Sequence, residues 1–339
     1  METRIDLPIP YRNLALQIFE CSLYLAMNIV SLVGNILVCV ALRRNSRLRT
    51  TTNLYLIALA ITDLVCAVFV MPLTCGTLIT GSWTYGPFLC RLQGFVILYF
   101  FHISPITMGI LAFNRYIRIV KTDCYKKIFS PKRSIILLGI VWISIAMYMV
   151  VPSFLGIQIY DFFPLYAVCT VIHLDSQMRL GHYIFVTFTF LFLPLTASFV
   201  CYFRVFTHVR RHNLDIAPSL QSRNGEPRIT VQEIRISKSL FGVVLGFAVC
   251  WVPSYIVALL VRFKLVEDLH PSVALICITG IFLSSTINPF IYAGMNRIFR
   301  LEFKKLLLCQ RQSLSSVVQP QPTTQSQATD SPLQLQCVR

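Results

Sequence analysis

The chain has 339 residues, of which 55% are hydrophobic and only 13% are charged. Apolar runs of bilayer-spanning length exclude an ordinary soluble domain. The net charge of +16 raises the alternative of nucleic-acid binding. Its Lys and Arg residues, however, lie next to the apolar runs, where they set membrane topology and attract anionic lipid. We therefore expect membrane lipids, and no nucleic acid, among the partners.

Seven apolar runs are long enough to cross a bilayer as helices, which takes about 20 residues each. They cover approximately residues 16–42, 52–79, 88–117, 134–153, 181–203, 239–261 and 272–295. The pattern predicts an all-α membrane protein, a seven-transmembrane helix bundle preceded by a short extracellular segment, residues 1–15.

The loops after spans one, three and five are rich in Lys and Arg, whereas the loops after spans two, four and six carry little excess positive charge. Cytoplasmic loops carry the excess of basic residues in membrane proteins. We therefore expect an extracellular N-terminus and a cytoplasmic C-terminus.

Two cysteines fall on the expected outer face, where the compartment is oxidising. Cys90 opens span three, and Cys169 lies in the middle of the loop between spans four and five. We predict a Cys90–Cys169 disulfide that folds this loop across the mouth of the bundle. Cys21 and Cys75 are the competing cysteines, although both fall within apolar spans.

The segment after span seven, 297–308, alternates apolar and basic residues. This pattern predicts a short amphipathic eighth helix on the inner leaflet. Cys309 is a candidate palmitoylation site and ends the membrane domain, residues 16–309. Residues 310–339 are rich in Gln, Ser, Thr and Pro, which predicts a disordered cytoplasmic tail. Phosphorylation of this tail would create negative charge for a partner with basic pockets.

Three motifs lie inside or at the end of apolar spans: Asn114 to Tyr116, Cys250 to Pro253, and Asn288 to Tyr292. In this order and at these membrane depths they resemble the switch motifs of rhodopsin-like (class A) G-protein-coupled receptors. The resemblance implies a plasma-membrane receptor that activates a heterotrimeric G protein and is bound by an arrestin. No constellation typical of an enzyme, and no inverted repeat typical of a transporter, is evident.

The resemblance also implies an ionic lock between spans three and six. In the family an acid usually precedes the arginine, but here Asn114 precedes Arg115, which leaves Glu233 as the carboxylate partner. We therefore expect a weakly held resting state with appreciable basal activity. The other positions that match the family's switch and G-protein contacts are Tyr116, Tyr202, Phe247, Pro253, Pro289 and Tyr292.

Asp63 is the only carboxylate expected in the middle of the bundle, where a charge is costly and therefore a functional candidate. Together with Ser104 and Asn288 it resembles the sodium pocket of rhodopsin-like receptors. Asp63 would be the charged ligand of an allosteric sodium ion, and no other cofactor is expected. A protonated, hydrogen-bonded Asp63 without an ion is the alternative.

A narrower resemblance is to melatonin receptors. It rests on Asn114 to Tyr116, on the loop from Thr122 to Ser130, and on Tyr160-Asp161 ahead of Cys169-Thr170. It implies coupling to an inhibitory-type G protein. The sequence departs from that family at Pro289, where the family has Ala, and the family's ligand-holding residues are not reproduced.

The outer cavity is expected to accept a small, neutral, largely apolar ligand. Ile97 stands where amine receptors carry an aspartate, and span seven has no lysine for a retinal Schiff base. The pocket candidates are Ile97, Phe101, Thr187, Phe190, Trp251, Tyr255, Ile278 and Phe282, with Ser254, His173 and His182 as polar points. In the alternative interpretation of His173 and His182, both are solvated loop and rim residues. The alternative for the function is an orphan or constitutively active receptor for a peptide or other ligand.

Overall fold

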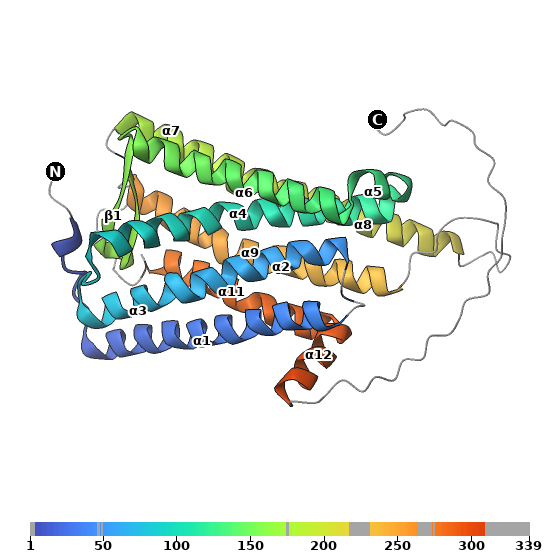
Figure 1. The fold of residues 1–339 in the computed structure, drawn as a ribbon, viewed down its shortest axis with the longest axis horizontal. Coiled ribbons are helices and arrows are strands. Elements are labelled where there is room, and N and C mark those ends of the chain that lie inside the picture. Colours follow the sequence, from blue (N-terminus) through green and yellow to red (C-terminus); the bar gives the residue numbers. More distant parts are fainter. Residues whose placement is uncertain are drawn as a thin grey trace.

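The computed structural model describes residues 4–45, 48, 50–173, 176–216, 231–263, 273 and 275–308. Within them, seven helical segments are long and apolar enough to cross a membrane. These segments match the seven apolar runs of the sequence one to one and lie side by side as a bundle (Figure 1). The prediction of a seven-helix membrane protein is confirmed, whereas Cys309 and the tail lie outside the described residues.

The first span is α1 (Leu14–Arg44), and the second consists of α2 (Thr51–Phe69) and α3 (Met71–Thr80). Pro72 lies in the first turn of α3. The N–H groups of a first turn have no partner within the helix, so the N–H group that proline lacks costs no hydrogen bond there. The third and fourth spans are α4 (Gly86–Val120) and α6 (Pro131–Phe154). The short helix α5 (Thr122–Ile128) lies between them.

The fifth span contains an irregularity that the sequence pattern does not show. It consists of α7 (Ser176–Val186), a π-helical segment η4 (Thr187–Phe192) and α8 (Leu193–Ile216). The sixth and seventh spans are α9 (Val231–Arg262) and α11 (Ile276–Met295), each with an internal proline. Proline interrupts the helical hydrogen-bond ladder and makes both helices able to bend.

The predicted eighth helix is α12 (Arg297–Leu307), which leaves the bundle axis at one end of the molecule (Figure 1). Its first turn is capped by Asn296, whose Oδ1 accepts a hydrogen bond from the N–H of Ile298 at 3.0 Å. Phe299 and Phe303 are buried against the bundle. The amphipathic pattern of the sequence is thereby confirmed, and we call this end of the bundle the α12 end.

The opposite end, the hairpin end, is covered by two antiparallel strands, β1 (Gln158–Phe163) and β2 (Val168–His173). The predicted disulfide joins Cys169 in β2 to Cys90 in α4, with their Cα atoms 5.3 Å apart. Cys21 and Cys75 carry free thiols. The disulfide therefore holds the hairpin across the bundle, as the sequence predicts.

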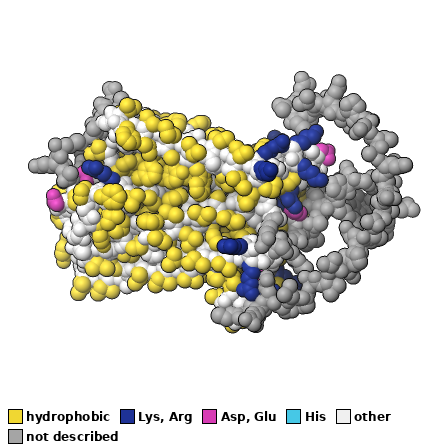
Figure 2. Space-filling view, viewed as in Figure 1, with side chains coloured by type: hydrophobic (Ala, Val, Ile, Leu, Met, Phe, Trp, Pro, Cys, Tyr) yellow, Lys and Arg dark blue, Asp and Glu magenta, His cyan; other side chains and the backbone are white. Residues whose placement is uncertain are grey.

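The outer surface of the bundle is apolar over most of its length (Figure 2). Large side chains such as Ile143, Phe203 and Val249 are 66%, 73% and 72% exposed, as expected of residues that face lipid tails. Lys and Arg side chains gather at the α12 end in this view.

Helices α9 and α11 are in close contact at Gly280. A Cβ atom at this position would lie 1.9 Å from Oγ of Ser254 and 2.4 Å from the carbonyl oxygen of Cys250. The Ser254 hydroxyl is placed to donate to the carbonyl of Cys250 at 2.8 Å or to that of Ile276 at 3.2 Å. Only glycine fits this contact without displacing one of the helices.

Candidate functional site

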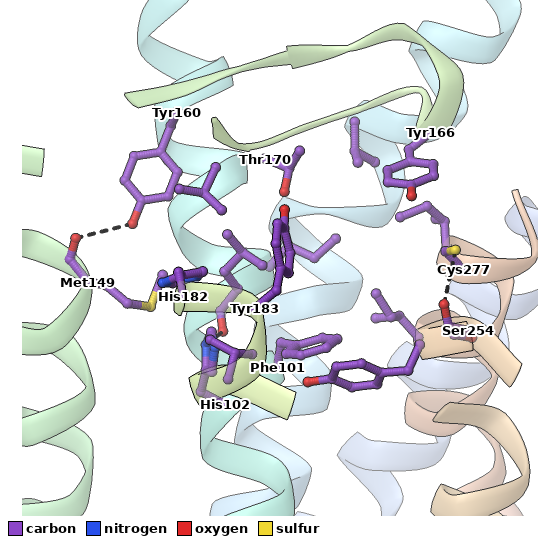
Figure 3. Close-up of a pocket in the computed structure, with 18 of the residues that line it drawn as sticks. Phe101, His102, Met149, Tyr160, Tyr166, Thr170, His182, Tyr183, Ser254 and Cys277 are labelled. Carbon is purple, nitrogen blue, oxygen red and sulfur yellow. Dashed lines mark hydrogen bonds between the residues drawn. The ribbon is translucent and has the colours of Figure 1, made fainter. Parts of the chain in front are cut away.

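A cavity with about 1010 Å³ of empty volume lies beneath the hairpin. Figure 3 shows Tyr160, Tyr166 and Thr170 of the hairpin on one side of it and Phe101 and His102 of α4 on the other. Its described lining contains no Asp, Glu, Lys or Arg side chain. The cavity is therefore suited to an uncharged, mainly apolar molecule.

Six of the predicted pocket residues line this cavity. They are Ile97, Phe101, His182, Ser254, Tyr255 and Ile278. The Nδ1 atom of His182 lies 2.9 Å from the hydroxyl of Tyr148, another lining residue. The hydroxyl of Ser254 is directed at backbone carbonyls, as described above, so this residue offers the cavity little polarity.

Three predicted pocket residues are not among the described residues that line this cavity. Phe190 is 5% exposed and packs edge-on against His102, with ring centroids 4.3 Å apart. Phe282 is fully buried against Tyr24 of α1. Thr187 begins the π-helical segment, whose wider turn changes the direction of the side chains relative to a regular α-helix.

The remaining two predicted residues contact the lining without being part of it. The His173 ring lies 4.2 Å from the ring of His182 and is 7% exposed. The Trp251 ring lies 4.2 Å from Phe101 and 4.6 Å from Phe247, on which it stacks. A continuous row of aromatic rings therefore leads from the cavity to the middle of α9.

Sequence reasoning missed several lining residues, among them His102, Tyr148 and Tyr160. The hydroxyl of Tyr160 donates to the carbonyl of Met149 at 3.4 Å (Figure 3). Burial raises the pKa of Tyr160 to about 12, so its phenol stays neutral at physiological pH. The sequence does contain one sign that His102 is a candidate site residue, because a polar side chain inside an apolar span is costly and therefore often functional.

The three residues predicted for the sodium pocket lie around one smaller cavity of about 400 Å³ beneath Trp251. The Nδ2 group of Asn288 donates to Oδ2 of Asp63 at 3.0 Å. The hydroxyl of Ser104 lies 3.4 Å from that of Thr62. One carboxylate with several hydroxyl and amide oxygens is a donor set that fits a hard cation such as sodium.

The predicted lock lies at the α12 end. One carboxylate oxygen of Glu233 accepts from Nη1 of Arg115 at 2.7 Å, and the other accepts from Nε of Arg118 at 3.0 Å. Asn114 instead accepts a hydrogen bond from the hydroxyl of Thr52 at 2.9 Å. Arg118 was not predicted, although it lies one helical turn from Arg115 and therefore on the same face.

A cavity of about 850 Å³ adjoins the lock, and Arg115, Glu233 and Tyr292 are among its lining residues. Tyr202 is fully buried on α8, and its hydroxyl, like that of Tyr292, has no hydrogen-bond partner among the described residues. Tyr116 is half-buried and packs beside Ile119 and Val205.

The other predicted switch residues are placed inside the helices. Phe247 is buried in the main core, and Pro253 and Pro289 interrupt α9 and α11. Pro289 packs so closely on α1 that a Cβ atom at Gly34 would lie 2.7 Å from its Cγ atom.

Comparison with known proteins supports this architecture. Melatonin receptor type 1A of Gallus gallus is 29% identical over 284 residues, which cover 83% of this chain and 77% of that receptor. The allatostatin-A receptor of Bombyx mori is 25% identical over 287 residues, covering 84% and 78% respectively. The crystal structure of squid rhodopsin shares the fold, with a TM-score of 0.74, 23% identity, and coverage of 92% of this chain and 95% of that one.

The family model of the seven-transmembrane receptors of the rhodopsin family matches residues 34–292. This match spans most of the chain and includes the residues of both the lock and the candidate sodium pocket. The chain therefore belongs to the rhodopsin family of seven-transmembrane receptors, which are G-protein-coupled receptors and not enzymes.

Proposed function

We propose that this receptor binds a small, neutral, largely apolar ligand in the cavity beneath the hairpin and activates an inhibitory-type G protein at the α12 end. The observation that carries this proposal is the row of rings formed by Phe101, Trp251 and Phe247. A ligand that shifts Phe101 would press on Trp251, which lies beside Pro253 in α9. Binding at one end of the molecule would thereby change the bend of α9.

The similarity to melatonin receptors supports a melatonin-like ligand and inhibitory coupling. The neutral lining of the cavity supports the same class of ligand. The similarity to an allatostatin-A receptor favours the alternative of a peptide ligand. An experiment that offers both kinds of ligand distinguishes these two proposals.

The distribution of charge supports an extracellular hairpin end and a cytosolic α12 end. Lys126, Lys127, Lys132 and Arg133 lie in or next to α5 at the α12 end, where anionic lipid would attract them. The G protein would then bind at the cavity beside Arg115. The tail and Cys309 would serve arrestin binding and palmitoylation, respectively.

In the resting state, Glu233 would hold α9 against α4 through Arg115 and Arg118. Outward movement of α9 breaks both contacts and opens the cavity beside them to a helix of the G protein. Asp63, Ser104 and Asn288 would hold a sodium ion in the resting state, and the ion would supply charge that offsets the buried carboxylate.

The test is a nucleotide-exchange assay on membranes that contain the receptor and either an inhibitory or a stimulatory G protein. The panel contains melatonin, other neutral aromatic molecules and peptides. Ile278→Trp fills the cavity and should abolish the response to the small ligand. The matched variant Ile140→Trp changes a side chain that is 58% exposed on the outer face of α6 and should retain the response.

A response to peptides alone would replace the small-ligand proposal with the peptide alternative. A small-ligand response that survives Ile278→Trp would place the binding site elsewhere. Activation of only the stimulatory G protein would contradict inhibitory coupling while leaving the binding site intact.

A further inference from the structure

His102 is a buried histidine in α4 that lines the ligand cavity. Its side chain is held from several sides: the Nδ1 atom lies 2.5 Å from the carbonyl oxygen of Leu98, one turn earlier. The ring packs edge-on against Phe190, with centroids 4.3 Å apart, and against Tyr148 at 6.0 Å. These contacts fix the orientation of an imidazole that is 3% exposed.

The contact with Leu98 determines which nitrogen carries the hydrogen. A carbonyl oxygen only accepts hydrogen bonds, so Nδ1 must donate and the neutral ring must present Nε2 as an acceptor. No acidic side chain among the described residues lines the cavity to balance a charged ring. Nε2 is buried and has no hydrogen-bond partner in the described part of the chain.

Tyr255 offers a second polar atom without a partner among the described residues. It lines the same cavity, is 8% exposed, and its hydroxyl makes no hydrogen bond there. The ring of Phe101 packs against both residues, with its centroid 5.4 Å from that of His102 and 5.1 Å from that of Tyr255. Buried polar groups are rarely left unpaired in folded proteins, except where a ligand or water completes them.

We infer that the ligand of this cavity is a neutral aromatic molecule whose N–H or O–H group donates a hydrogen bond to Nε2 of His102 while its ring lies against Phe101. This inference rests on the proposed function of the cavity and adds the direction of the hydrogen bond. A molecule of the same shape that only accepts hydrogen bonds leaves Nε2 unpaired and binds more weakly.

Thermal unfolding of the purified receptor in detergent tests the inference with three flat probes of similar size. Indole carries an N–H donor, whereas benzofuran and 1-methylindole carry none. Indole should raise the Tm of the wild-type receptor. It should also bind roughly tenfold more tightly than the other two probes, because one additional hydrogen bond changes the affinity by about this factor. Benzofuran controls for the added bulk of the methyl group.

His102→Phe keeps an aromatic ring but removes the acceptor, and it should bring the affinities for indole and benzofuran together. His208→Phe, the same substitution in α8 near the α12 end, should leave the preference for indole unchanged. If His102→Phe does not yield folded protein, the wild-type comparison alone decides.

Equal binding of indole and benzofuran to the wild type, or no binding of indole, would contradict the inference. So would a preference for indole that persists in His102→Phe. These assays contain no G protein, so failure of inhibitory coupling would leave their outcome unaffected. Conversely, a small-ligand response in nucleotide exchange without any donor preference would refute only the role of His102.

Discussion

Removing the carboxylate of Glu233 should raise the activity of the receptor in the absence of ligand. This side chain binds Arg115 at 2.7 Å and Arg118 at 2.8 Å, and both contacts join α9 to α4. Asn114 cannot replace it, because its side-chain oxygen is bonded to Thr52 of α2. Glu233→Ala therefore breaks both contacts at once, whereas Arg118→Met breaks only one.

The size of the effect follows from the exposure of the partners. Hydrogen bonds to charged groups contribute about 1.5–3 kcal/mol each. The side chains of Arg118 and Glu233 are 31% and 22% exposed, so solvent screening reduces the free energy that the contact between them contributes. A bias of about 1–2 kcal/mol remains, which raises the ratio of open to closed receptor by roughly 5- to 30-fold. Arg118→Met should raise it by less.

Nucleotide exchange on ligand-free membranes measures this ratio once receptor density has been matched between variants. Asp123→Ala removes an exposed acid at the same end of the bundle and should leave basal exchange unchanged. Asn114→Asp should lower basal exchange, because a carboxylate next to Arg115 adds a second partner for the arginine. If neither Glu233→Ala nor Asn114→Asp alters basal exchange, the lock does not determine the resting population.

Asp63→Asn should abolish the effect of sodium on ligand affinity, because an amide supplies no charge to balance the ion; sodium titration of ligand binding checks this, and unchanged sensitivity would place the ion elsewhere. An epitope next to Met1 should be accessible to antibody on intact cells and one at Arg223 only after permeabilisation, and the reverse labelling would overturn the orientation. Gly280→Ala should destabilise the receptor by roughly 1–3 kcal/mol, because the new methyl group overlaps Ser254; Gly139→Ala, which meets open space on α6, is the matched control. A Gly280→Ala variant with the Tm of wild type would show that the helices separate at little cost.

The bundle was predictable because each span carries a long apolar run, and no tertiary contact is needed to recognise it. The lock and the group formed by Asp63, Ser104 and Asn288 were predictable for a different reason. Charged and amide side chains are rare inside a membrane span, and the switch motifs fixed their place on the helices. Arg118 was missed because basic residues at helix ends usually serve topology alone.

The ligand cavity was predicted less well, since its lining depends on how each helix is rotated about its axis. The π-helical segment changes that rotation in span five and removes Thr187 and Phe190 from the cavity. Tyr160 enters it only because the hairpin folds inward, and a single sequence does not show the pairing of β1 with β2. His102 was overlooked because its significance comes from the unpaired Nε2 atom, which only coordinates show.

The close contact at Gly280 also determines how far a small rotation of α9 reaches. The Oγ atom of Ser254 and the carbonyl oxygen of Cys250 in α9 meet the backbone of α11 there, because Gly280 has no side chain. This contact can serve as a fulcrum for a rotation of α9. From Ser254 to Glu233 the helix forms a lever arm of about 30 Å, at about 1.5 Å per residue. A tilt of about 10° at the fulcrum moves the far end of that arm by about 5 Å. This displacement exceeds the 2.7 Å length of the contact between Arg115 of α4 and Glu233 of α9. A small tilt of the part of α9 beside the ligand cavity is therefore enough to separate α9 from α4 at the α12 end.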